Sequence, residues 1–176
     1  MKLSGHTILI TGGASGIGYA LAKSFIQQNN TVIICGRNTE KLDAAKQRLP
    51  QLITISCDIT RHDELSELQA QLSVRFPELD MLINNAGIQH SLEFAAMEID
   101  ERLIQDEINT NFTAQVLLTN RLLPLLTTNK PGTIVFTGSA LGQVAKHSAP
   151  IYCATKAAIH KHALHFILMP FLHCLM

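Results

Sequence analysis

Thr11-Gly12-Gly13-Ala14-Ser15-Gly16-Ile17-Gly18 is the stretch of sequence that decides the fold. It follows the apolar run His6–Thr11 and leads into the helical pattern Tyr19–Ile26, so a strand, a glycine turn and a helix come in succession. Gly12 suits a tight turn, Gly16 lets the backbone approach a diphosphate, and Gly18 lets the helix pack close to the strand. The free N–H groups at the start of such a helix attract an anion. The stretch therefore predicts a dinucleotide-binding turn, with a glycine turn that binds no ligand as the alternative.

The spacing of these glycines, G-x3-G-x-G, is one residue longer than the usual dinucleotide fingerprint. A phosphate-loop nucleoside triphosphatase is disfavoured, because no Lys-Ser or Lys-Thr pair follows the last glycine. The turn thus favours a dinucleotide over a nucleoside triphosphate.

The composition of the chain indicates one globular domain without a nucleic-acid or membrane partner. Its 176 residues suffice for a sizeable core, and its formal net charge is +0. This neutral balance gives no support for binding nucleic acid or an anionic membrane, and no apolar run is long enough to span a bilayer. No charged-then-apolar leader precedes the first strand, and the cysteines form no C-x-x-C pair. These features predict a reduced, cytoplasmic setting.

Apolar, β-branched runs alternate with helical patterns along the rest of the chain. Further strands are expected at Thr31–Gly36, Leu52–Cys57, Met81–Gly87 and Thr133–Thr137. Helices are expected at Thr39–Leu49 with Thr39 as N-cap, from Thr60 to about Phe76, from about Glu101 to Leu126, and around Tyr152 and Lys156. This alternation predicts an α/β fold with a doubly wound parallel sheet.

Arg37 directly follows the second expected strand. An acidic residue at this position would bind the ribose hydroxyls of adenosine and favour NAD, whereas an arginine can pair with a 2′-phosphate and favours NADP. Arg37 therefore predicts a preference for NADP(H), with an exposed arginine in a turn as the alternative.

Five motifs, in this order, resemble the short-chain dehydrogenase/reductase family. They are the glycine turn, Asn84-Asn85-Ala86-Gly87, Asn111 on the long helix, Ser139, and Tyr152-Cys-Ala-Thr-Lys156. The separation between Ser139 and Tyr152 also matches that family, and the resemblance covers residues 3 to 160. It implies a Rossmann-like sheet of about five strands in the order 3-2-1-4-5.

The resemblance implies a role for each matching residue. Tyr152 would exchange a proton with the substrate oxygen, while Lys156 would hold the nicotinamide ribose. Ser139 would bond the reacting oxygen, and Asn111 would hold a water in a proton path to Lys156. The implied catalytic residues are Asn111, Ser139, Tyr152 and Lys156, and the implied cofactor-binding residues are Gly12, Ser15, Gly16, Ile17, Gly18, Arg37, Asp58, Ile59, Asn85, Ala86, Gly87, Tyr152 and Lys156. No metal is implied.

The spacing of Tyr152 and Lys156 suits this chemistry, because residues four apart share one face of a helix. A free tyrosine has a pKa of about 10 and is a poor base at neutral pH. A nearby ammonium group favours the phenolate and lowers that pKa. The alternative is an ordinary pair on a helix surface.

These features together predict an NADP-preferring short-chain oxidoreductase that interconverts a small-molecule alcohol and a carbonyl by hydride transfer. The alternative is a catalytically inactive, truncated remnant that acts at most as a nucleotide-binding or interaction module. An S-adenosylmethionine-dependent transferase on a similar sheet is disfavoured, because such an enzyme does not need the combination of Ser139, Tyr152 and Lys156. The resemblance also implies a homo-oligomer that pairs through the long helix and the Tyr152 helix. The unusual end of the Tyr152 helix argues against this assembly.

The last residues, 161–176, depart from the family pattern, so the family domain is expected to end at residue 160 and to be truncated. Half of the eight histidines lie between His160 and His173, and Pro170 would interrupt a helix that should run on. We expect an out-of-frame or truncated tail that leaves the fifth strand as an apolar edge. The rivals are a membrane-anchoring tail, which is too short to span, and a metal site formed by His160, His162, His165, His173 and Cys174.

Overall fold

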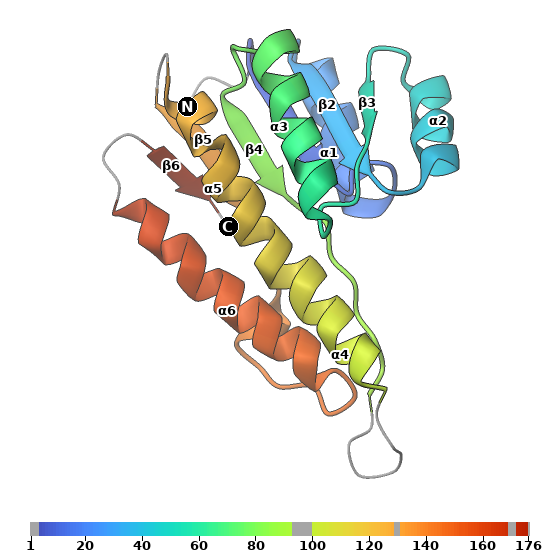
Figure 1. Cartoon of the computed structure of the whole chain (residues 1–176), viewed down its shortest axis with the longest axis vertical. Helices are drawn as coiled ribbons and strands as arrows, with labels where there is room; N and C mark the ends of the chain where they lie inside the picture. Colours follow the sequence, from blue (N-terminus) through green and yellow to red (C-terminus); the bar gives the residue numbers. More distant parts are fainter. Residues whose placement is uncertain (1–3, 93–99, 129–130, 169–171, 176) are drawn as a thin grey trace.

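The structure is a computed structural model of the chain. It describes residues 4–92, 100–128, 131–168 and 172–175. Within these ranges it is an α/β sandwich whose central parallel sheet is covered by helices on both faces (Figure 1).

The sheet has six parallel strands in the order β3-β2-β1-β4-β5-β6. Their bounds are Thr7–Thr11 for β1, Thr31–Gly36 for β2, Ile53–Ser56 for β3, Met81–Asn84 for β4, Gly132–Phe136 for β5 and Leu172–Leu175 for β6. The predicted order of the first five strands is confirmed, with β1 pairing β2 from Thr7 opposite Thr31 and pairing β4 from Ile8 opposite Met81. Between β1 and β4 the strand order reverses, and such a point is where nucleotides bind in open α/β sheets.

Alternate side chains of the strands β1, β2 and β4 enter two separate cores, which explains the near-continuous apolar runs in the sequence. On one face, Leu9 and Leu82 pack with Leu68 and Leu118 from the covering helices. The opposite core contains, among others, Ile8, Ile10, Ile34, Ala22, Leu42 and Ala45. The sheet is therefore doubly wound, as predicted.

The helices that cover the two faces are α1 (Gly16–Gln27), α2 (Thr39–Arg48), α3 (His62–Arg75), α4 (Glu101–Ile108), α5 (Ala114–Thr127) and α6 (Pro150–Ile167). The predicted cap of α2 is wrong by one residue, because Asn38 has the extended backbone of an N-cap and its side chain accepts from Lys41 N. A short 3-10 turn, η2 (Ala140–Gly142), precedes α6.

The long helix expected from Glu101 to Leu126 is interrupted by a π turn. This turn, η1 (Asn109–Thr113), separates α4 from α5 and contains the buried Asn111. A turn of this kind inserts one extra residue into a helix and is often found at functional sites.

The sheet has one strand more than the approximate number expected. The expectation that β5 forms the edge is wrong, because β6 pairs with β5 in parallel from Gly132 opposite Leu172. The helix that carries Tyr152 continues to Ile167, while Pro170 lies outside the described residues. Among the described residues, no helix combines the length and apolar character needed to cross a lipid bilayer. The domain boundary after residue 160 stays a prediction.

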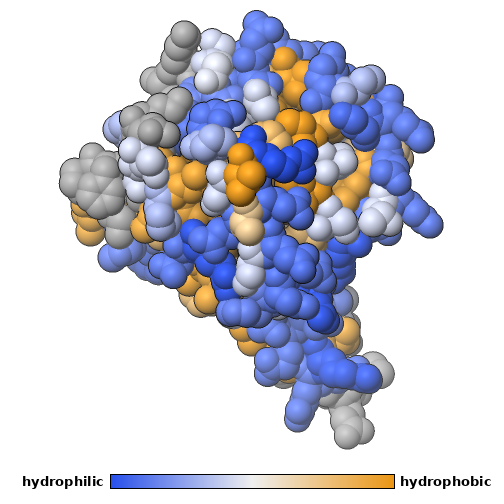
Figure 2. All heavy atoms as spheres, turned by 45° about the horizontal axis from the view of Figure 1, so that its top comes forward, coloured by the Kyte–Doolittle hydropathy of each residue, from blue (hydrophilic) through white to orange (hydrophobic). Residues whose placement is uncertain are grey.

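Figure 1 shows α4 and the start of α6 projecting beyond the carboxyl ends of the strands. Hydrophilic residues cover most of that projection in the view of Figure 2.

Candidate functional site

The glycine turn between β1 and α1 has the backbone that its sequence requires. Gly12 and Gly16 have positive φ angles of 64° and 55°, which a residue with a Cβ atom rarely adopts. A Cβ atom at Gly12 would lie 3.0 Å from the Cα of Ala86, and one at Gly18 would lie 2.6 Å from the carbonyl oxygen of Gly12. The turn therefore brings its backbone against the end of β4 in a way that only glycine allows.

Thr11 ties this turn to the end of β4. Its Oγ1 accepts hydrogen bonds from the backbone N–H groups of Asn85, at 3.0 Å, and Ala86, at 2.9 Å. The side-chain amide of Asn85 donates back to the carbonyl oxygen of Thr11 at 3.0 Å. The two central strands are thus cross-linked by side chains where they leave the sheet.

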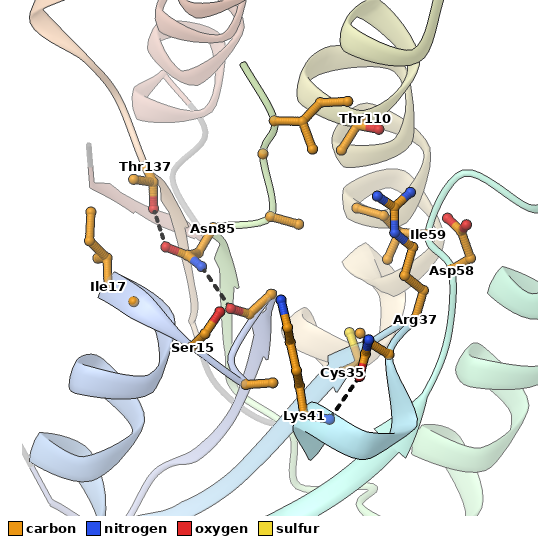
Figure 3. Close-up of a pocket in the computed structure, with 18 of the residues that line it drawn as sticks. Ser15, Ile17, Cys35, Arg37, Lys41, Asp58, Ile59, Asn85, Thr110 and Thr137 are labelled. Atoms are coloured by element: carbon orange, nitrogen blue, oxygen red, sulfur yellow. Dashed lines mark hydrogen bonds between the residues drawn. The ribbon is translucent and has the colours of Figure 1, made fainter. Parts of the chain in front are cut away.

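A cavity of about 590 Å³ opens at this place (Figure 3). It is lined by every predicted cofactor residue except Gly18, namely by Gly12, Ser15, Gly16, Ile17, Arg37, Asp58, Ile59, Asn85, Ala86, Gly87, Tyr152 and Lys156. Gly18 is buried beneath the turn, where its role is the close packing just described.

Two cations lie at the end of the cavity formed by β2 and α2. Figure 3 shows Arg37 and Lys41 extending from that end into the cavity, with Asp58 and Ile59 on the neighbouring segment after β3. The carboxylate of Asp58 is held by the backbone N–H and the hydroxyl of Thr60, at 3.0 and 2.7 Å. The pair of cations gives this end a positive charge suited to a phosphate.

Tyr152 and Lys156 stand next to each other on α6 and line the same cavity. The Nζ atom of Lys156 lies 5.6 Å from the centre of the Tyr152 ring and donates to the carbonyl oxygen of Thr137 at 2.7 Å. Lys156 is buried, and this burial lowers the pKa of its ammonium group.

Ser139 lines a second cavity, of about 430 Å³, which it shares with Gln143, Lys156 and His160. Its Oγ atom accepts a hydrogen bond from Leu141 N at 3.2 Å and so caps the 3-10 turn η2. Lys156 lines both cavities, whereas Tyr152 is among the residues of the larger one and Ser139 among those of the smaller one. The predicted contact between Ser139 and a reacting oxygen stays a prediction.

Asn111 is fully buried in the π turn, behind the wall of the cavity. Its Oδ1 accepts from Ile88 N and its Nδ2 donates to Ile88 O, both at 2.8 Å. The Nδ2 atom also reaches Thr155 Oγ1 at 3.3 Å on the helix of Tyr152. Asn111 therefore joins three elements around the site, while its role in a proton path stays a prediction.

The sequence did not single out Lys41, Thr110 and Thr137 as lining residues. Lys41 lies in the first turn of α2, where a helical pattern alone does not show which way a side chain points. Thr110 and Thr137 enter the cavity through the π turn and the end of β5, which are tertiary features. No local signal could have found these two.

Among the described residues, the histidines near the end of the chain do not form a cluster of possible metal ligands. His162 lies in edge contact with Phe112, Phe136 and Phe166, at ring distances of 5.1–6.1 Å. Among the described residues, no group of three or more His, Cys, Asp or Glu side chains is placed to hold an ion.

The residues of the larger cavity fit a dinucleotide. Its lining combines the glycine turn, the cations Arg37 and Lys41, and the pair Tyr152 and Lys156. Such a site can bind a diphosphate at the start of α1 and exchange a proton at Tyr152.

Comparisons with known proteins agree with the fold described above. The family model described as short chain dehydrogenase matches residues 6–166. The "Uncharacterized oxidoreductase DltE" of Bacillus subtilis is 40% identical over 164 residues, which are 93% of this chain and 65% of the relative. The "NADP-dependent 3-hydroxy acid dehydrogenase YdfG" of Salmonella typhi is 30% identical over 158 residues, 89% of this chain and 63% of the relative.

A solved structure of a short-chain dehydrogenase from Streptomyces avermitilis superimposes with a TM-score of 0.88 at 29% identity. The match covers 98% of this chain and 64% of that one. The chain thus spans slightly less than two thirds of the length of these similar proteins, at 63–65%.

Proposed function

The chain belongs to the short-chain dehydrogenase family, and from that premise we propose that it takes part in the NADP(H)-dependent interconversion of an alcohol and a carbonyl in a small molecule. The observation that carries this proposal is one shared cavity. The glycine turn, the cations Arg37 and Lys41, and the pair Tyr152 and Lys156 all line it.

Tyr152 is the proposed general acid and base. It donates a proton to the carbonyl oxygen in reduction and accepts the hydroxyl proton in oxidation. The nicotinamide, when bound, supplies or accepts the hydride. Lys156 places a positive charge beside the phenol ring, and this charge favours the phenolate form.

Thr137 holds Lys156 in place for this role. The hydrogen bond between Lys156 Nζ and the Thr137 carbonyl oxygen uses one of three ammonium donors. The remaining donors are available to a ribose hydroxyl, and the hydrogen bond that Lys156 donates to Thr137 O keeps the ammonium beside Tyr152.

The preference for NADP(H) rests on Arg37, as in the sequence-based prediction, and on Lys41 beside it. A 2′-phosphate would meet two cations, whereas the ribose hydroxyls of NAD would find no acidic partner at the end of β2. The "NADP-dependent" name of the Salmonella typhi relative supports this direction.

The proposed setting and partners follow from the family and the sequence. The four cysteines are free, which suits a reducing, cytoplasmic compartment. A homo-oligomer through α5 and α6 is consistent with the exposed Leu117 and Leu164 on these helices.

The experiment that tests the function compares melting curves and turnover of the purified chain. A cooperative melt that NADPH raises more than NADH is expected, with a gain of about 2.7 kcal/mol at a hundredfold excess over Kd. Turnover is then measured with a panel of aldehydes and ketones and NADPH.

The chain offers a matched control for Tyr152→Phe, because its second tyrosine, Tyr19, lies on α1 outside the cavity lining. Tyr152→Phe is expected to abolish turnover and keep nucleotide binding, and Tyr19→Phe to retain both. Nucleotide binding without turnover on any substrate would support the inactive, nucleotide-binding alternative. A chain whose melt neither nucleotide shifts would contradict the proposal.

A further inference from the structure

A ladder of buried polar side chains joins the α4–η1–α5 helix to the chain that leaves β4. Its four helical members share one face, are spaced four residues apart and are fully buried: Glu107, Asn111, Gln115 and Thr119. Figure 1 shows the segment after β4 running alongside this helix in the opposite direction.

The helical members bond to every second residue of that segment. Thr119 Oγ1 accepts from Asn84 Nδ2 at 2.9 Å, and Gln115 Nε2 donates to Ala86 O at 2.8 Å. Asn111 bonds both backbone groups of Ile88, and Glu107 Oε1 accepts from His90 N at 2.9 Å. Four helical residues advance about 6 Å and two extended residues about 6.6 Å, so the two spacings match.

The π turn keeps these side chains on one face. In a regular α-helix, residues four apart are rotated by about 40° from each other. Over four such residues this rotation would turn the last side chains away from the segment that follows β4. A turn with i→i+5 bonds rotates each residue by less, and η1 lies in the middle of the ladder. The extra residue of the π turn thus offsets the drift.

Two members of the ladder are costly as packing residues. Glu107 Oε2 and Gln115 Oε1 are buried and have no hydrogen-bond partner among the described residues. A buried polar atom without a partner costs about 1–3 kcal/mol, which an apolar residue of similar size would avoid. What each of these side chains contributes is therefore the one hydrogen bond that it makes to the segment after β4.

That segment forms a wall of the nucleotide cavity. Ala86, Gly87 and Ile88 line the cavity, and Ala86 lies against Gly12 of the glycine turn. Glu107 and Gln115 do not line it.

We propose that Glu107 and Gln115 are positioning residues, which hold the backbone of residues 86–90 in the place where it forms the wall of the nucleotide cavity. The proposal rests on the proposed function, because it takes this cavity as the cofactor site.

The test uses two variants of Glu107 that differ in one property. Glu107→Gln keeps an oxygen acceptor for His90 N, whereas Glu107→Leu has a similar size and no acceptor. Asp106→Asn, on the exposed neighbouring residue of α4, is the matched control for the lost charge. The readouts are Kd for NADPH by titration calorimetry, and hydrogen exchange of the His90 amide in the nucleotide-free protein.

Glu107→Leu is expected to raise Kd and to speed exchange at His90, each about tenfold, because a hydrogen bond of ordinary strength is lost. Glu107→Gln and Asp106→Asn are expected to stay within about threefold of the native chain in both readouts. Gln115→Met, which removes the donor to Ala86 O, is expected to weaken nucleotide binding in the same way and serves as the second variant if Glu107→Leu does not fold.

The proposal is overturned if Glu107→Leu binds NADPH as tightly as the native chain, or if Glu107→Gln is as impaired as Glu107→Leu. If Glu107 had a purely structural role, its substitution would lower the melting temperature, and Glu107→Gln and Glu107→Leu would not differ in Kd for NADPH. If the native chain binds no nucleotide, the proposed function fails. The exchange rates at His90 then still decide whether Glu107 holds this backbone, because they are measured without nucleotide.

Discussion

The ammonium of Lys156 donates a hydrogen bond of 2.7 Å to the carbonyl oxygen of Thr137, which ties the middle of α6 to the chain just after β5. Tyr152 lies one helical turn earlier on the same face, so this bond also anchors the part of α6 that carries the phenol ring. The part of the cavity wall that carries Tyr152 and Lys156 is thus held by the sheet as well as by the helix.

Lys156→Met is expected to change how stability depends on pH. Burial lowers the pKa of Lys156 below 10.5 in the folded chain. At pH values between this lowered pKa and 10.5, the unfolded chain therefore binds more protons than the folded chain. The native chain should therefore gain stability relative to Lys156→Met as pH rises through this interval, and the difference should be constant above it. Melting temperatures at a series of pH values between neutrality and 10.5 measure this, with Lys161→Met on the exposed side of α6 as control. A difference that does not change with pH would contradict the prediction.

Gly18→Ala is expected to destabilise the chain by about 1–3 kcal/mol, because its Cβ would overlap backbone that cannot move away. The nearest atoms would be Gly12 O and Asn85 Nδ2, both at 2.6 Å. Gly36→Ala is the matched control, since its Cβ would meet nothing within 4 Å and should change stability by at most about 1 kcal/mol. Urea denaturation of the nucleotide-free chain gives both values, and equal losses in the two variants would refute the packing argument.

Arg37→Ala and Lys41→Ala are each expected to raise Kd for NADPH by about 10- to 150-fold, the equivalent of one charge-assisted hydrogen bond. Kd for NADH should stay nearly unchanged, because NADH carries no 2′-phosphate. Lys23→Ala, which removes the same charge from the exposed face of α1, controls for general electrostatics. Equal weakening of NADPH and NADH by Arg37→Ala would mean that Arg37 does not recognise the phosphate.

His162→Leu is expected to make the chain less sensitive to acid. Burial among phenylalanine rings, and then the nearby His165, lower the pKa of His162 below 6.5. The unfolded chain therefore binds the proton more strongly, and native stability falls as pH drops from 6.5 through the folded pKa. The variant should lose less stability over this interval, whereas His147→Leu in an exposed loop should follow the native chain. Parallel pH profiles for native and His162→Leu would count against this.

The sequence predicted those parts of the fold that local patterns determine. The apolar runs gave the first five strands and their order, and the glycine spacing gave the turn, because each depends on residues close together in the chain. Cap assignment was harder, since Asn38 and Thr39 can both cap a helix and only the backbone angles decide. The strand β6 was missed because its pairing with β5 depends on the neighbour more than on its own sequence.

The candidate site shows the same division. Most of the predicted motif residues line one cavity, because parallel strands bring their carboxyl ends to one edge of the sheet. Gly18 and Asn111 do not line this cavity, and Ser139 lines the second one. Lys41, Thr110 and Thr137 join the residues of the larger cavity through contacts between distant elements, for which the sequence holds no periodic signal. The π turn is a further example, since its place reflects the match between a helix and an extended segment.

The polar ladder also restricts how the length of this chain can vary. One residue inserted or deleted between Glu107 and Thr119 would rotate every later member by about 100° and turn it away from its partner after β4. An insertion before Glu107 or after Thr119 leaves all four pairs in place. Natural variants of different length should therefore keep this stretch constant and place their insertions and deletions at its two ends.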